Sequence, residues 1–317
     1  MMRYLPQGRL TRLRALRVAK EIPKELISSI TACDLSETSR DIFVKNLKLN
    51  GIEDDPRIKY VLSDTNKHMF AIEHPNLYNV VDLDPYGSAV PFLYSALQCV
   101  SDNGLLCITC TDNRVLCGSD RHKCYYFYGS ARGGNNMFEE TALRILHYTI
   151  SKTAATMGKS VKVLLSVLSD FYVRVFVQVN ESKKNCWETI AQHGLEFFCQ
   201  NCGIPHYHYF GHENKKHSYS VNSLDIPGGV CPSCNDKWKV SKINSRTSLA
   251  RQPLRWILRS ANAQHAKKHW KWNRECPSEN HEQQKDNWTT FCHSDRGTLG
   301  QIPLLLQSRY LVLSQGL

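Results

Sequence analysis

Two aspartates close an apolar run in the stretch VVDLDPYGS, residues 80–88. The run reads as a buried strand, and an unpaired carboxylate inside a protein is costly. Asp84 stands directly before a Pro-Tyr-Gly turn, so it is expected at the exposed lip of a sheet, where a carboxylate can do chemistry. The alternative is an ordinary strand end followed by a polar turn. For Asp82 the alternative is a side chain that faces only the adjacent helix.

Acidic residues also end three other predicted strands. The four acids at strand ends are Asp34, Asp64, Asp84 and Asp112. Strands that alternate with helices are typical of a parallel, doubly wound α/β sheet with helices on both faces. Ligands of such sheets bind beyond the carboxyl ends of the strands, so the four acids outline one site at that edge.

The elements that must position these acids follow from apolar periodicity and turn signals. Helices are predicted for residues 14–22, 35–49 and 91–102, and strands for residues 27–34, 57–64, 78–85 and 104–112. Residues 161–179 read as two further β-rich runs, which as an antiparallel pair would complete the sheet.

The acid pattern fits a nucleotide-like cofactor. An acid at the end of the second strand of a doubly wound sheet can hydrogen-bond ribose hydroxyls, and Asp34 has this place. Asp64 could reach a base amino group. The alternative for either residue is a helix-capping role, and Ser36 could equally begin the helix after Asp34.

Two Cys-x2-Cys pairs lie about thirty residues apart. The four cysteines are Cys199, Cys202, Cys231 and Cys234. This spacing, with turn-forming residues in each pair, predicts a four-thiolate zinc ribbon that holds a small polar segment together. The alternative is four free thiols. Three nearby histidines could compete as ligands or face RNA: His206, His208 and His212.

The amino-acid composition indicates which binding partners and which cellular compartment to expect. The net charge is +11, which favours polyanions and nucleic acid first, although an ordinary basic surface would also explain it. Thirteen cysteines without a secretory signal indicate an intracellular protein. No apolar run approaches the roughly 20 residues of a membrane span, so a soluble protein without a membrane partner is predicted.

The segment DLDPYG, residues 82–87, resembles the Asp-Pro-Pro-Tyr turn of methyltransferases that act on exocyclic or amide nitrogens. A carboxylate and a prolyl carbonyl both accept hydrogen bonds from an amino group and aim its lone pair at a sulfonium methyl. Alignment and charge placement then supply most of the catalysis. An aromatic ring beside them flanks the flat base.

The resemblance extends well past this turn. The segments RALRVAKEIP, ACDLS, GLLCITCTD, ALRIL and LLSVLSDFYVRVFV are similar to the tRNA guanine-26 N2-dimethyltransferase family, over roughly residues 11–238. This similarity implies a Rossmann-like class I methyltransferase fold. It also implies an S-adenosylmethionine-dependent enzyme that places one or two methyl groups on the exocyclic amine of a tRNA guanine.

The resemblance implies a role for each residue at a matching position. The residues of the guanine amine pocket would be Asp84, Pro85 and Tyr86; those at the cofactor would be Arg14, Asp34 and Asp64; Asp112 would line the substrate side. For Asp112 the alternative is structural closure of its strand end.

Three segments are expected in the chain. Residues 1–180 would form the methyltransferase domain, residues 181–240 a smaller module with the zinc site, and residues 241–317 a basic, poorly ordered tail.

The sequence departs from the family at both ends. Arg12 stands where the family has a glycine, and a glycine at this position lets the backbone approach the cofactor closely. The strand before it is expected to be incomplete, and the tail after Val240 does not resemble the family.

These departures leave other hypotheses beside the enzyme. One is a catalytically impaired RNA-binding relative or splice variant that keeps the fold without binding the cofactor. Another is a methyltransferase of the same fold that acts on DNA or on a protein amide. Nucleus, mitochondrion and cytoplasm stay open as compartments, and the oligomeric state is not indicated.

Overall fold

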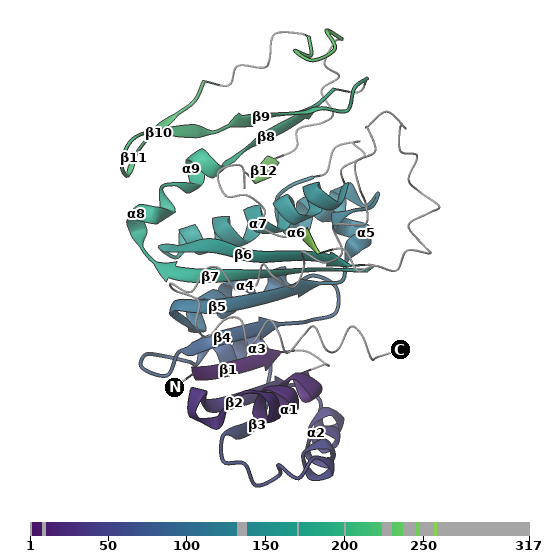
Figure 1. The fold of residues 1–317 in the computed structure, drawn as a ribbon, viewed down its shortest axis with the longest axis vertical. Coiled ribbons are helices and arrows are strands. Elements are labelled where there is room, and N and C mark those ends of the chain that lie inside the picture. The colour runs from purple at the N-terminus through teal and green to yellow at the C-terminus, as the bar shows by residue number, and fades with distance from the viewer. Residues whose placement is uncertain are drawn as a thin grey trace, which may run out of the picture.

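The computed structural model describes residues 2–7, 11–131, 138–169, 171–199, 201–223, 230–236, 245–247 and 257–258. Its main body is an eight-stranded sheet in the order β13-β6-β7-β5-β4-β1-β2-β3 (Figure 1). The strands are β1 (Met2–Gln7), β2 (Ile27–Asp34), β3 (Ile58–Leu62), β4 (Tyr78–Leu83), β5 (Val100–Cys110), β6 (Lys159–Ser169), β7 (Tyr172–Glu181) and β13 (Ile257–Leu258). β1 to β5 are parallel, and β7 is antiparallel to both β5 and β6. The predicted doubly wound α/β sheet is confirmed.

The strand before the first helix is present, so the prediction that it is incomplete was wrong. β1 lies between β2 and β4, and Tyr4 pairs with Ile30 on one side and Val80 on the other. Backbone groups in a buried strand must be hydrogen-bonded, and here two neighbouring strands supply partners along both edges. A segment with a weak strand pattern of its own therefore completes the centre of the sheet.

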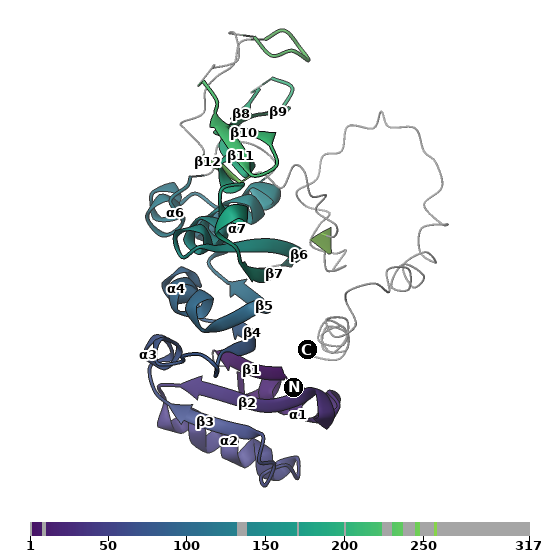
Figure 2. The same ribbon diagram turned by 90° about the vertical axis from the view of Figure 1, so that its left-hand side faces the viewer.

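Helices cover both faces of the sheet. The helices of the main body are α1 (Thr11–Glu21), the 3-10 turn η1 (Lys24–Leu26), α2 (Glu37–Leu49), α3 (Thr65–Phe70), α4 (Val90–Cys99), α5 (Asn113–Leu116), α6 (Arg121–Tyr128) and α7 (Phe138–Thr156). One core packs α3, α4, α6 and α7 against one face, and a second core packs α1 and α2 against the other. Figure 2 shows α3, α4 and α6 on one side of the sheet. Alternation along β7 sends Val173 and Val175 to the first core and Phe176 to the second.

A smaller module follows β7 and lies beyond α7, at the end of the molecule opposite β3 (Figure 1). Its elements are α8 (Lys183–Cys186), α9 (Thr189–Gln192), β8 (His193–Phe198), β9 (Pro205–Tyr209), β10 (Gly211–Lys215), β11 (Ser218–Val221) and β12 (Ser245–Thr247). β12, β8 and β9 form one antiparallel sheet, and β10 and β11 form a hairpin.

Most of the predicted tail, residues 241–317, lies outside the described residues. Two short strands of it are described: β12 pairs with β8 of the module, and β13 pairs with β6 of the main sheet. Among the described residues, no helix is both long and apolar enough to cross a bilayer.

Candidate active site and metal centre

The Asp-Pro-Tyr-Gly turn directly follows β4 and is tied to both neighbouring strands. The Asp84 N–H donates to the Gln7 carbonyl at 3.0 Å, which fixes the turn to β1. The Gly87 N–H donates to Thr111 Oγ1 at 2.8 Å, and the Thr111 N–H donates back to the Gly87 carbonyl at 2.9 Å. Gly87 has a φ of +75°, a conformation that a side chain would strain. The turn is therefore held rigidly at the carboxyl edge of the sheet, as predicted for Asp84.

The three residues of the predicted amine pocket differ in exposure. Pro85 is buried and the Asp84 side chain is 9% exposed, whereas Tyr86 is 73% exposed. A carboxylate at the rim with an exposed aromatic ring beside it suits a flat, polar ligand that arrives from solvent.

Arg14 of α1 joins Asp82 of β4 and Asp84 of the turn that follows it. Its Nη2 lies 2.5 Å from Asp84 Oδ2, and its Nη1 lies 3.3 Å from Asp82 Oδ1. Burial alone would lower the pKa of Arg14, but the carboxylates of Asp82 and Asp84 outweigh it and raise this pKa well above its ordinary value. The structure thus places Arg14 against the candidate catalytic carboxylate, where its charge orients Asp84.

Asp82 is completely buried and has a different environment from Asp84. It accepts hydrogen bonds from Tyr4 Oη at 3.1 Å, from Arg14, and from Nη2 of Arg174 on β7. Arg174, itself 5% exposed, also donates to Thr109 Oγ1. The side chain of Asp82 therefore faces α1 and holds two arginines in place under the site, which is the alternative left open for it.

Replacing Asp82 with Asn is expected to lower the free energy of unfolding by about 3–5 kcal/mol, because it leaves buried arginine charge uncompensated. Denaturant unfolding followed by circular dichroism measures this loss. Asp41→Asn is the matched control. Asp41 forms an exposed ion pair with Arg40, and a change within about 0.5 kcal/mol is expected on replacing it. Equal stability of the two variants would contradict the role given to Asp82.

Asp112 follows β5 and is bound by a tyrosine that the sequence did not single out. Tyr128 Oη lies 2.9 and 2.8 Å from the two Asp112 oxygens and donates its single proton to them. Ser88, on the Asp-Pro-Tyr-Gly turn, donates to Tyr128 Oη at 2.9 Å. Burial raises the pKa of Asp112, and the hydrogen bond from Tyr128 partly offsets this. Asp112 thus closes its strand end while remaining linked to the turn.

Tyr128 and Arg174 are the site residues missed in the sequence. The one local signal for Tyr128 is that Cys124 and Tyr128 stand four apart and so share the inner face of α6. Arg174 interrupts a run of apolar residues in YVRVFV, and a charge in such a run is a signal for a buried partner.

Asp34 ends β2 and Asp64 lies two residues after β3, at the same edge of the sheet as Asp84. Asp34 Oδ1 accepts from the Ser36 N–H at 3.0 Å, and Ser36 in turn caps α2. Asp64 Oδ1 accepts from the Lys67 N–H at 2.9 Å and caps α3. The capping alternative is thus observed for Asp64, while each bond uses only one carboxylate oxygen. Their cofactor roles stay predictions.

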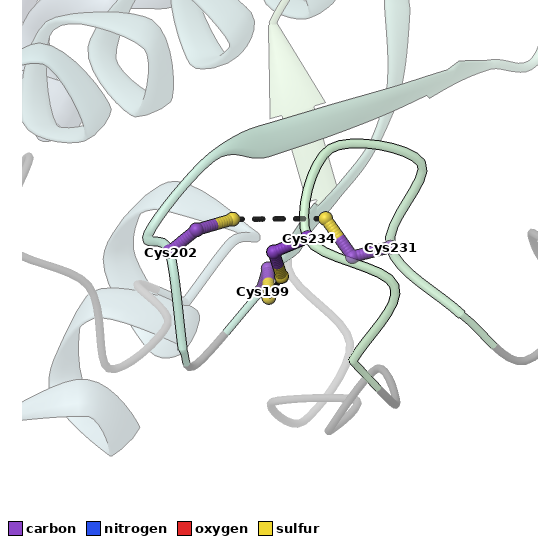
Figure 3. Close-up of side chains that lie close together, drawn as sticks. All are labelled: Cys199, Cys202, Cys231 and Cys234. Atoms are coloured by element: carbon purple, nitrogen blue, oxygen red, sulfur yellow. Dashed lines mark hydrogen bonds between the residues drawn. The ribbon is translucent and has the colours of Figure 1, made fainter.

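The four cysteines converge at one point of the smaller module (Figure 3). Their sulfur atoms all lie within 4.8 Å of one another, with 3.5 Å between Cys199 and Cys234 and 3.6 Å between Cys202 and Cys231. Four thiolates about 2.3 Å from a zinc ion at tetrahedral angles lie about 3.8 Å apart, so the cluster has the dimensions of such a site.

The surroundings of the cluster favour the thiolate form at two of its four sulfur atoms. The pKa values of Cys199 and Cys231 are lowered, and those of Cys202 and Cys234 are raised by hydrogen bonds with their sulfur neighbours. The backbone N–H of Cys202 lowers the pKa of Cys199 to about 7, and a deprotonated sulfur is the form that binds metal. Within the described part of the chain, these four cysteines are the one group of three or more His, Cys, Asp or Glu side chains close enough to share a metal ion, and the three nearby histidines are not part of it. His212 instead lies with Nδ1 2.5 Å from Asn222 Oδ1.

A family model decides where this arrangement belongs. The model of the N2,N2-dimethylguanosine tRNA methyltransferases matches residues 10–243. The chain belongs to this family. The match includes the Asp-Pro-Tyr-Gly turn and all four cysteines, and it confirms the resemblance predicted for residues 11–238.

Known members of the N2,N2-dimethylguanosine tRNA methyltransferase family cover more sequence than this chain. A tRNA (guanine(26)-N(2))-dimethyltransferase of Schizosaccharomyces pombe is 41% identical over 196 residues, which are 61% of this chain and 34% of that protein. One from Arabidopsis thaliana is 38% identical over 232 residues, 72% of this chain and 38% of that protein. The chain thus spans little more than a third of the length of these relatives.

A solved structure supports the fold of this family member. Trm1 from Pyrococcus horikoshii, in complex with S-adenosyl-L-methionine, superposes with a TM-score of 0.59 at 24% identity. The similarity covers 70% of this chain and 62% of that one.

Arg12, which was noted above as standing where the family has a glycine, lies in α1. Its side chain is outside what the structure describes.

Proposed function

We propose that this chain is an S-adenosylmethionine-dependent methyltransferase that methylates the exocyclic amine of guanine 26 in tRNA. The observation that carries the proposal is the Asp84 carboxylate, held by Arg14 in a turn that two strands fix at the carboxyl edge of the sheet. Family membership and the printed activities of the relatives support it.

The turn has the groups that this reaction needs. The guanine amine would donate hydrogen bonds to Asp84 and to the Pro85 carbonyl, which aims its lone pair out of the plane of the base. Bound S-adenosylmethionine would supply an electrophilic methyl group. The amine loses one proton for each methyl group gained, and Asp84 would accept that proton. Arg14, with its Nη2 2.5 Å from Asp84 Oδ2, would hold this carboxylate in place before the amine binds.

Polar residues at the carboxyl edge of the sheet would bind S-adenosylmethionine. Gln7 Oε1, at the end of β1, is buried and has no hydrogen-bond partner among the described residues. An orphaned acceptor of this kind can be satisfied by a bound ligand. Asp34 and Asp64 would bind the ribose and the adenine side. The presence of β1 removes one of the two arguments for a relative without cofactor binding.

The RNA must present its guanine outside the base stack to reach this turn. Tyr86, which is 73% exposed, would stack on the flipped base. The net charge of +11 would attract the phosphate backbone and contribute affinity rather than sequence choice. A tRNA substrate implies an intracellular location, and nucleus and mitochondrion are the compartments proposed.

The cysteine cluster would bind one structural zinc ion. Among its described residues, the module that carries the cluster has short strands and few buried apolar side chains, so metal ligation would contribute much of its stability. The zinc ion would therefore hold the module together and take no part in methyl transfer.

Calorimetry with S-adenosylmethionine tests the cofactor, and methyl transfer to tRNA tests the substrate. We expect micromolar binding of the cofactor, and methyl incorporation into tRNA that is lost when guanine 26 is replaced by adenine. The absence of cofactor binding by a chain shown to be folded would overturn the proposal in favour of an RNA-binding relative. Equal methylation of both tRNAs would overturn the choice of guanine 26.

A further inference from the structure

Helix α6 presents an unusual outer face to solvent. Tyr125 is 67% exposed and Tyr126 is 80% exposed, although they are neighbours in an eight-residue helix. The inner face of the same helix is formed by Cys124 and Tyr128, which are fully buried. Exposing a large aromatic ring to water does not stabilise the fold. Two adjacent exposed rings are therefore typical of a surface that binds a partner.

Positive charge is concentrated in α6 and in the segment directly before it. Residues 113–128 contain three cations, Arg114, Arg121 and Lys123, and Asp120 as the one acid. Asp120 Oδ2 lies 3.5 Å from Arg114 and 3.6 Å from Lys123, so one carboxylate holds two cations in place. The Arg114 side chain is 82% exposed and that of Lys123 is 55% exposed, which leaves both charges accessible.

The helix is fixed rigidly to the candidate site. Its last residue, Tyr128, donates to Asp112 and accepts from Ser88 on the Asp-Pro-Tyr-Gly turn. The Tyr128 carbonyl accepts from Thr149 Oγ1 of α7 at 2.9 Å. Figure 2 shows α6 at the outer edge of the side of the sheet that also carries α3 and α4. Whatever binds the outer face of α6 is thus held in a set position relative to Asp84.

We propose that this surface, named the α6 face and formed by Arg114, Arg121, Lys123, Tyr125 and Tyr126, binds RNA nucleotides that flank the target guanine. Cations beside exposed aromatic rings are the combination that binds unstacked nucleic acid, because the cations bind phosphates and the rings stack on bases. When a base leaves the stack its neighbours lose a stacking partner, which the two tyrosines replace. This inference rests on the proposed function and adds a second contact surface to it.

Affinity for tRNA, measured by fluorescence anisotropy at several salt concentrations, tests the α6 face. The double variant Tyr125→Ala/Tyr126→Ala is expected to bind tRNA about tenfold more weakly. The double variant Arg121→Gln/Lys123→Gln is expected to reduce the slope of log affinity against log salt by roughly one for each cation removed. Cofactor affinity, measured by calorimetry, is expected to stay unchanged in both, because neither substitution touches the Asp-Pro-Tyr-Gly turn.

Matched controls lie on other helices. Tyr94 of α4 is 51% exposed, and its ring centroid lies 6.1 Å from that of Phe70 of α3. Lys45 of α2 is also exposed. Tyr94→Ala and Lys45→Gln are expected to bind tRNA as the unchanged chain does. The single variant Tyr126→Ala, at the most exposed ring of the helix, repeats the test if the double variant is unstable.

The outcomes separate this inference from the proposed function. Unchanged tRNA affinity and salt slope in the α6 variants, with tRNA binding and methylation intact, would overturn the α6 face alone. A chain that binds cofactor but no tRNA would overturn both. Weakened binding in the α6 variants and in the controls alike would overturn the α6 face as a specific contact.

Discussion

Replacing Asp84 with Asn is expected to reduce the rate of methyl transfer by about 10²–10⁴-fold, while affinity for tRNA and for S-adenosylmethionine changes little. The substitution keeps the size of the side chain but removes the charge that would align the amine and accept its proton. Arg14 retains Asp82 as a partner, and its side chain is 22% exposed, so water can solvate the freed guanidinium. Single-turnover methylation of tRNA with labelled cofactor measures the loss.

The control for this variant is Asp54→Asn, at an exposed acid in the loop between α2 and β3. It is expected to leave the rate unchanged. If Asp84→Asn loses tRNA binding and methylation to the same extent, the residue supports the fold or the RNA contact, and its assignment to the chemical step is wrong. The environment of Asp82 explains why Asp84 is the residue to change, because Asp82 is buried beneath two arginines.

Removing zinc is expected to unfold the smaller module before the main sheet. The apparent contribution of a structural zinc ion is about 10–16 kcal/mol at neutral pH, far more than a module of this size gains from its core. Hydrogen exchange with and without a chelator measures the effect. Protection should be lost first in β8, β9, β10 and β11, while β4 and β5 stay protected.

Cys231→Ser is the corresponding variant, because Cys231 is buried in the cluster. Cys186→Ser in α8 is the matched control, at a buried cysteine outside the cluster. We expect one zinc ion per chain in the control and none, or weakly held zinc, in Cys231→Ser. A melting curve that the chelator does not alter, from a chain that contains no zinc, would contradict the metal centre.

Local patterns in the sequence determined much of this protein. The alternation of strands and helices, the carboxylate at the end of β4 and the two cysteine pairs are all readable from residues a few positions apart. Hydrophobic periodicity and turn chemistry depend on near neighbours, so these features were predicted correctly. Each cysteine pair forms its own short turn, and two such turns are the ligand pattern of a four-thiolate site. The spacing therefore predicted that the four cysteines converge.

Only the tertiary structure decided which polar side chains meet. Asp82 and Asp84 are two residues apart, yet one is buried beneath two arginines and the other lies at the rim. Arg174, which donates to Asp82, is 92 residues away from it, and Arg14, which contacts both aspartates, is 68 residues away from Asp82. β1 likewise became a strand because β2 and β4 offered it backbone partners. Pairings of this kind depend on which elements become neighbours, and the packing of the whole sheet sets those neighbours.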